Sequence, residues 1–198
     1  GISSTSEINK TSLLAFLIAC SFLNSVHPDD LLNSMSIKSE LHNFSTIKKN
    51  KNLQYEWELK GHKMSQYNNN ITHISRPKLV IYDEDSETKI NSETAVDPSG
   101  KLDEIYLKDN VFISSKNSQD STITKMYTSY AIVYVSNNLI ETDRDVTIIT
   151  TDSKTTGKGF SANMETGVIT ILSDVKRVIT ENDKIRTIEG NQMIYNTN

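Results

Sequence analysis

The chain has 198 residues and a formal net charge of −4, which suits one domain plus a short appendage and lacks the basic surplus that nucleic-acid binders use to attract phosphates. Its single cysteine, Cys20, excludes an intrachain disulfide. The four histidines lie far apart with no Cys or carboxylate at ligand spacing, so neither a metal site nor a cofactor is expected.

The amino end holds the one sustained apolar run, 13–23, preceded by Lys10. We predict a cytoplasmic stretch at residues 1–10, a single-pass transmembrane anchor helix at 11–27, a linker at 28–35 and a periplasmic domain at 36–198, with the cationic flank on the cytoplasmic side. The run is shorter than the roughly 20 residues of a typical span. Leu17 to Cys20 also fits lipoprotein processing, in which Cys20 is acylated and everything before it removed, and both interpretations stay open.

From Met35 onward, apolar and polar residues alternate with the two-residue period of half-buried strands. The clearest case is 53–59 (LQYEWEL), where every odd position is large and apolar and every even one is polar. Further strands are predicted at 78–82, 89–95, 104–107, 110–114, 127–135, 138–141, 146–150, 159–163, 168–172 and 175–180.

Residues typical of tight turns separate these segments, as at 97–100 (DPSG), 108–110 (KDN), 136–138 (SNN) and 165–167 (ETG). Three units echo one another, 105–111 (IYLKDNV), 140–146 (IETDRDV) and 169–175 (ITILSDV), and indicate stacked hairpins. The sequence therefore predicts an all-β fold, a V-shaped β-jelly roll or open sandwich of antiparallel strands. Its open ends would leave backbone groups free for strand addition.

Several motifs, in this order and spacing, resemble those of the LptC family of lipopolysaccharide transport. They are 39–45 (SELHNFS) followed by 53–59, then 76–85 (RPKLVIYDED), 156–163 (TGKGFSAN), Gly167 and 172–175 (LSDV). The tail at 188–198 (IEGNQMIYNTN) looks more like a repeat of the related LptA bridge proteins, and we expect an extra terminal strand there.

The resemblance implies a non-enzymatic protein of the bacterial inner membrane, with its main domain in the periplasm. Such a protein takes lipopolysaccharide from the ABC transporter formed by LptB, LptF and LptG and passes it to LptA. Its acyl chains would lie in an apolar groove between strand layers. The alternatives are an LptA-like or lipoprotein bridge without a permanent anchor, and a carbohydrate-binding or adhesive sandwich, which would need an exposed aromatic platform.

Candidate lipid-binding residues are the large side chains expected on the inward face of the strands. They are Tyr55, Trp57, Ile74, Leu79, Ile81, Ile132, Tyr134, Ile148, Ile169 and Ile171. The acidic run 83–85 is interpreted as a solvated turn, because adjacent carboxylates point in different directions and no calcium-loop spacing accompanies them. No nucleophile elbow or phosphate-binding loop occurs, so we expect no catalytic residues.

Overall fold

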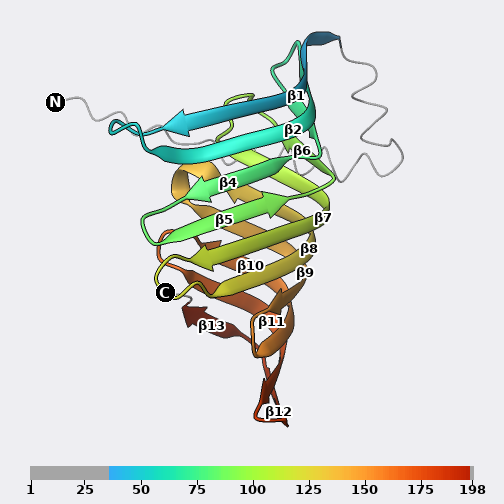
Figure 1. The fold of residues 1–198 in the computed structure, drawn as a ribbon. Helices are drawn as coiled ribbons and strands as arrows, with labels where there is room; N and C mark the ends of the chain where they lie inside the picture. Colours follow the sequence, from blue (N-terminus) through green and yellow to red (C-terminus); the bar gives the residue numbers. More distant parts are fainter. Residues whose placement is uncertain (1–35, 197–198) are drawn as a thin grey trace, which may run out of the picture. The chain divides into compact units, whose positions relative to one another are not determined.

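Antiparallel strands follow one another throughout the part of the chain that the computed structural model describes, residues 36–196 (Figure 1). No helix long and apolar enough to span a membrane occurs within that range, and the anchor expected at 11–27 lies outside it. The strands are β1 Ile37–Lys49, β2 Tyr55–Tyr67, β3 Thr72–Ser75, β4 Lys78–Tyr82, β5 Ser86–Asn91, β6 Thr94–Asp97, β7 Glu104–Asn117, β8 Ile123–Tyr134, β9 Leu139–Ile149, β10 Ser153–Asn163, β11 Val168–Glu181, β12 Lys184–Gly190 and β13 Met193–Asn196, with a 3-10 turn, η1 Val135–Asn137, between β8 and β9.

Each long strand belongs to two layers, because its two halves pair differently. In β7, residues 112–117 pair with β5, whereas 106–108 pair with β6. In β2, residues 57–60 pair with β4 and 63–66 with β3. The sheet is thus folded onto itself: β4, β5 and β12 lie in a first layer, β3, β6 and β13 in a second, and the other strands run through both (Figure 1).

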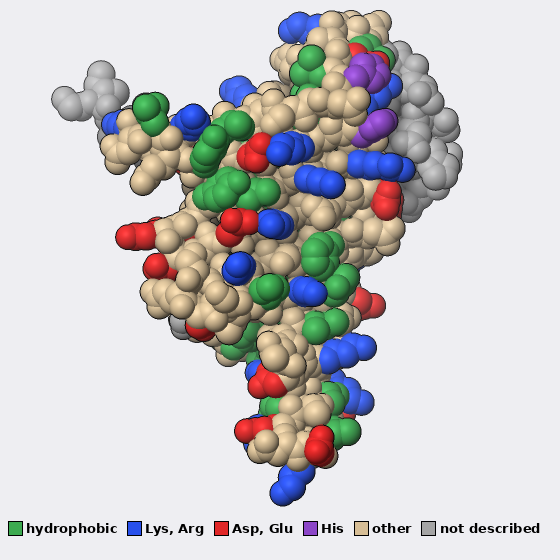
Figure 2. All heavy atoms as spheres, viewed as in Figure 1, with side chains coloured by type: hydrophobic (Ala, Val, Ile, Leu, Met, Phe, Trp, Pro, Cys, Tyr) green, Lys and Arg blue, Asp and Glu red, His purple; other side chains and the backbone are tan. Residues whose placement is uncertain are grey.

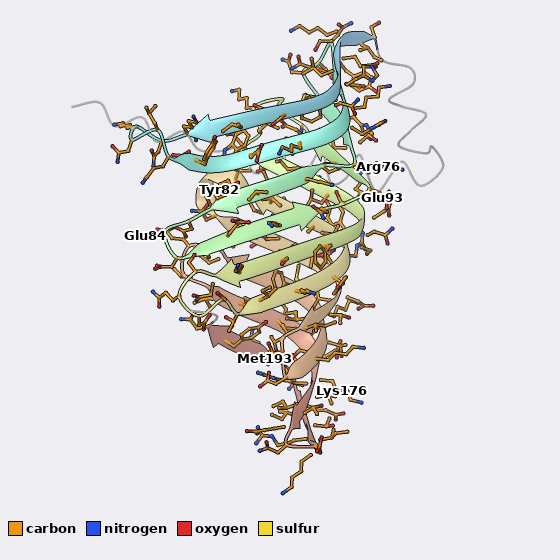
Figure 3. The ribbon with its side chains drawn as sticks, in the orientation of Figure 1. Arg76, Tyr82, Glu84, Glu93, Lys176 and Met193 are labelled. Atoms are coloured by element: carbon orange, nitrogen blue, oxygen red, sulfur yellow. The ribbon has the colours of Figure 1, made fainter. Side chains whose placement is uncertain are left out.

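The strands cross between the layers along one edge, which we call the corner line and define by residues 43, 76, 93, 109–110, 144–145, 159 and 174. Backbone φ is positive at six of these positions, Asn43, Arg76, Asp109, Asn110, Gly159 and Asp174, five of which carry the residue types that adopt this conformation most readily. Neighbouring corners are joined, since the Arg76 N–H donates to the Glu93 carbonyl at 2.8 Å and the Glu93 N–H to that of Asp109 at 3.0 Å. Figure 3 shows Arg76 and Glu93 together on this edge.

The opposite edge carries the hairpin turns, and we call it the turn edge. Backbone hydrogen bonds join adjacent turns of the same layer there. In the first layer the Ser118 N–H donates to the Asp85 carbonyl at 2.9 Å, and in the second the Met164 N–H donates to the Asn138 carbonyl at 2.7 Å. The acidic run 83–85 is such a turn, between β4 and β5. Tyr82 and Glu84 mark this edge in Figure 3.

The core lies between the layers and follows from the alternation of the strands. In β9, Ile140, Val146 and Ile148 are almost fully buried, whereas Ile149 beside them is 37% exposed. Small residues occupy inward positions of the second layer, including Ala95 and Ala131, both fully buried. Burial of these apolar side chains contributes about 25 cal/mol per Å² and stabilises the two-layer arrangement.

The sequence located most of the strands, but it missed β3 and the first half of β10, and it divided long strands at their corners. The strands predicted at 104–107 and 110–114 are one strand, β7, and the same holds for β9 and β11. Conversely, the segment 89–95 is not one strand, because the chain turns between β5 and β6. The echoed units 105–111, 140–146 and 169–175 are the three places where β7, β9 and β11 cross the corner line.

Candidate functional site

An apolar hollow between the two layers is the main concave feature formed by the inner faces. Its apolar lining comes from β7, β8 and β9 in the first layer and from β9, β10 and β11 in the second, and we call it the interlayer groove. The apolar members are Ile113, Met126, Ile140, Ile148, Phe160, Ala162, Met164 and Ile169, and the polar side chains are Ser86, Thr88, Ser115, Thr124 and Asn163.

The chemistry of the lining is uniform. Every polar side chain in it is a hydroxyl or an amide, and none carries a charge. Such a surface offers hydrocarbon contacts in its depth and hydrogen bonds toward the turn edge, where Ser86 begins β5. Within residues 36–196, no group of three or more His, Cys, Asp or Glu side chains gathers where a metal ion could be held.

The groove is narrow in this structure. It encloses a cavity of about 50 Å³, which is room for a few water molecules and far below the roughly 300 to 1,000 Å³ of small-molecule sites. The expected open V is narrow here, because the two apolar inner faces bury each other from water. A bulky guest would require the layers to move apart.

Seven of the ten predicted site residues lie on the inner faces. Ile148 and Ile169 line the groove itself. Ile74, Leu79, Ile81 and Ile171 are buried in the core beside it, and Trp57 packs against that core while half-buried. Their role in binding a ligand stays a prediction.

The other three predicted residues, Tyr55, Ile132 and Tyr134, lie on outer faces. In β8 the buried inward residues are Ala131 and Val133, so Ile132 and Tyr134 point outward, toward Tyr106 and Leu139 of the neighbouring strands. Partial burial there raises the pKa of Tyr134, helped by the carboxylates of Glu141 and Glu104. The prediction that these two side chains face inward was wrong, because the alternation places them on the opposite face of β8.

Tyr55 leaves the inner face because of a bulge at Glu56. Trp57 pairs with Lys48 and Tyr55 with Lys49, so two residues of β2 span one step of β1. Tyr55 then contacts the outward Tyr82, with ring centroids 5.9 Å apart, and the Lys49 ammonium lies 5.0 Å from its ring. The perfect alternation of 53–59 gave no sign of this bulge.

Further aromatic side chains lie on the outer face, where a carbohydrate-binding sandwich would need its aromatic platform. Phe112 and Tyr127 pair across β7 and β8 with centroids 5.1 Å apart, and Tyr127 is 43% exposed. The rings of the Phe112–Tyr127 and Tyr55–Tyr82 pairs are tilted by 46° and 41°, so neither pair makes the flat platform on which a sugar stacks. Figure 2 shows hydrophobic side chains interspersed with Lys, Arg, Asp and Glu on this face.

Six apolar groove residues were not among the sequence candidates: Ile113, Met126, Ile140, Phe160, Ala162 and Met164. Met126 follows the alternation of β8, in which Thr124 also faces inward. Phe160 and Ala162 lie within the motif 156–163 and alternate in phase with each other. Applying the two-residue alternation of a strand to that motif would have identified both as inward-facing residues.

Among the strands of residues 36–196, both ends of the folded sheet are open edges. At the amino-terminal end, β1 pairs with β2 alone, and Ile37, Leu41 and Ile47 are 44 to 53% exposed. At the carboxy-terminal end, β12 and β13 each pair with β11 alone. The terminal strand expected within 188–198 is thus present, as the end of β12 and the whole of β13.

Comparison with known proteins identifies a family for most of the chain. A family model described as lipopolysaccharide-assembly, LptC-related, matches residues 12–197. Among solved structures, the chain is similar to LptH from Pseudomonas aeruginosa, described as the LptA homologous periplasmic component of the lipopolysaccharide transport device. The match has 11% identity and a TM-score of 0.41, and it covers 78% of this chain and 94% of that chain. No curated protein matches the chain.

Proposed function

Because this chain belongs to the LptC family of lipopolysaccharide-assembly proteins, which are non-enzymatic, we propose that its interlayer groove holds the acyl chains of lipopolysaccharide. The lipid would be received from the ABC transporter of the inner membrane and passed on toward the outer membrane. The observation that carries this proposal is the composition of the groove, which combines eight apolar side chains from both layers with no charged one.

Uptake of an acyl chain requires the layers to part, because the cavity holds only about 50 Å³. At the corner line the long strands themselves run from one layer into the other, and backbone hydrogen bonds join Arg76, Glu93 and Asp109. Within residues 36–196, by contrast, the backbone hydrogen bonds between turns join only turns of the same layer. Opening at the turn edge therefore breaks apolar contacts but none of these backbone bonds. A bound acyl chain replaces the lost contacts with its own methylenes, at about 0.8 kcal/mol for each one buried.

Transfer along the transport path would use the open edges of the sheet. Strand β1 offers its free edge to the transporter formed by LptB, LptF and LptG, and β12 and β13 offer theirs to LptA. Continuous strand pairing would align the grooves of successive proteins. The anchor at 11–27 would keep the chain at the inner membrane with the β domain in the periplasm, and an LptA-like or lipoprotein bridge without a permanent anchor is the alternative.

Filling the groove tests the proposal. Ala162 is 8% exposed and lines the cavity, so Ala162→Leu places three more carbons in it. We expect the affinity of the full chain for lipopolysaccharide to fall about tenfold, which corresponds to the loss of one or two buried methylenes of the lipid. Binding would be measured with purified lipopolysaccharide in detergent.

The matched control is Ser161→Leu, on the neighbouring outer face, where Ser161 pairs with Glu141 and Thr170. This variant adds the same side chain without entering the groove, so its affinity should equal that of the unsubstituted chain. Thermal unfolding of both variants checks that the fold is retained. Equal binding by the two variants would contradict a lipid site between the layers.

A further inference from the structure

Within residues 36–196, two hydrogen-bond donors lie buried without a partner at the carboxy-terminal end of the fold. They are Nε of Arg177 and the hydroxyl of Tyr195. Arg177 belongs to the half of β11 in the first layer, which pairs with β12, and Tyr195 belongs to β13 in the second layer. The two layers thus each contribute one unsatisfied polar group to this end.

Both side chains face the interior. Arg177 pairs with Thr155, which pairs with the groove residue Ile148, so the three share one inward row of the first layer. Tyr195 pairs with Ile169, which lines the groove from the second layer. Tyr195 therefore continues the inner face of the second layer by one strand beyond the groove, and Arg177 continues that of the first layer by two strands.

The electrostatics keep both groups as donors. Burial raises the pKa of Tyr195 to about 12, although the positive charge of Arg177 acts on the phenol in the opposite direction, which shows that the two groups are close. Tyr195 is thus a neutral O–H at physiological pH, and Arg177 carries its charge under all such conditions. Within residues 36–196, Arg177 takes part in none of the ion pairs.

We propose that Arg177 and Tyr195 form an anion site at the carboxy-terminal end of the interlayer groove, and that it binds a phosphate group of the lipid headgroup. This inference rests on the proposed function. The buried Nε of Arg177 and the buried phenol hydroxyl of Tyr195 both lack an acceptor, and a phosphate ester supplies several acceptor oxygens with a matching negative charge. Because Ile169 links Tyr195 to the groove, one amphipathic molecule can place acyl chains in the groove and a phosphate at this end.

The test compares Arg177→Gln with Lys176→Gln in the full chain. Lys176 is the adjacent residue, exposed on the outer face opposite Thr156 and Glu189, and it is labelled in Figure 3. The two variants lose the same charge from opposite faces. For lipopolysaccharide, we expect Arg177→Gln to bind about tenfold more weakly, as loss of a charged hydrogen bond implies, and Lys176→Gln to bind as the unsubstituted chain does.

A second probe, the same lipid after removal of its phosphate groups, isolates the contact. All three proteins should bind it with equal affinity. Tyr195→Phe removes only the hydroxyl and keeps the ring, so it should show a smaller loss for the phosphorylated lipid alone, even if Arg177→Gln proves unstable. A third arm adds millimolar inorganic phosphate, which should weaken binding of the phosphorylated lipid only slightly.

The outcomes separate the two claims. If the unsubstituted chain binds neither lipid, the proposed function fails and this site with it. If it binds both, but Arg177→Gln and Tyr195→Phe match Lys176→Gln, the groove stands and the anion site is refuted. If inorganic phosphate binds with dependence on Arg177 while the two lipids bind equally, the site takes free phosphate and the assignment to the lipid headgroup is overturned.

Discussion

At the scale of single residues, neighbouring side chains of one strand meet opposite surroundings. Ile148 is 1% exposed and lines the groove, whereas Ile149 is 37% exposed on the outer face. Burying an isoleucine side chain fully contributes about 1.5 to 3 kcal/mol. Burial of Ile148 therefore stabilises the observed register of β9, whereas the partly exposed Ile149 contributes much less to it. The inner faces also leave little spare room, as Gly157 shows.

Gly157→Ala should destabilise the fold. An added Cβ would overlap Cγ2 of Ile171, which is fully buried, and would lie 3.0 Å from the carbonyl oxygen of Ser173. We expect the free energy of unfolding to fall by about 1 to 3 kcal/mol, as overpacking of a core does, measured by denaturant titration. Gly190→Ala is the control, because its Cβ would meet only the Gln192 carbonyl oxygen at 3.7 Å; an equal loss there would contradict the packing argument.

Alkaline pH should destabilise the protein partly through Tyr195. Its pKa is raised to about 12 in the folded chain from about 10 in the unfolded one. Between these values the unfolded state loses a proton that the folded state keeps, so this contribution is intact below pH 10 and is lost as pH rises through 12. Tyr195→Phe should reduce the slope of unfolding free energy against pH by about one proton in this window, and an unchanged slope would contradict the burial of the phenol.

At the scale of elements, the corner line explains what the sequence could and could not predict. Alternation identified most of the strands, because half-buried strands of any sandwich share that period, but it missed β3 and the first half of β10. Corners and hairpin turns both use Asn, Asp and Gly, since both need positive φ, so 108–110 looked like a turn although β7 continues through it. The LptC resemblance was confirmed, but motifs carry no information on bulges.

The phase of the site residues failed for a related reason. Pairing of β8 with β9 is interrupted between Tyr127 and Ile132, so a period counted along β8 does not carry across the corner. Beyond it the inward positions hold Ala131 and Val133, while the larger Ile132 and Tyr134 lie outside. Closely packed layers favour small inward side chains, a constraint that appears only when the facing layer is known.

Asp109 tests the corner line directly, because its φ is 61°. Asp109→Val should lower the free energy of unfolding by about 1 to 2 kcal/mol. This is the cost of a left-handed backbone conformation for a residue whose side chain, unlike that of Asp, cannot hydrogen-bond to the nearby backbone. Asp109→Gly should change it little, since glycine adopts this conformation readily and the carbonyl that accepts from the Glu93 N–H remains. Equal effects of the two substitutions, measured by denaturant titration, would contradict a strained corner.

At the scale of the β domain, residues 37–196, the folded sheet has the corner line on one side and the turn edge on the other. This arrangement suits two requirements of lipid transport, an apolar interior and exposed edges for partner proteins. The inner faces bury apolar surface from water. Within residues 36–196 no backbone hydrogen bond joins the turns of one layer to those of the other, so we expect the layers to part on that side. The open edges at β1 and at β12 and β13 allow pairing with other β proteins. Each feature follows from strand pairing and burial, and the family supplies the identity of the lipid.

Photo-crosslinking at Ile148 and Ile149 tests the central claim most directly. A photoreactive side chain at position 148 faces the groove, and one at position 149 faces outward; the two variants differ in sequence by one step. In cells that export lipopolysaccharide, the probe at 148 should capture the lipid and the probe at 149 should not. Equal capture at both positions, or capture at 149 alone, would contradict a lipid path between the layers.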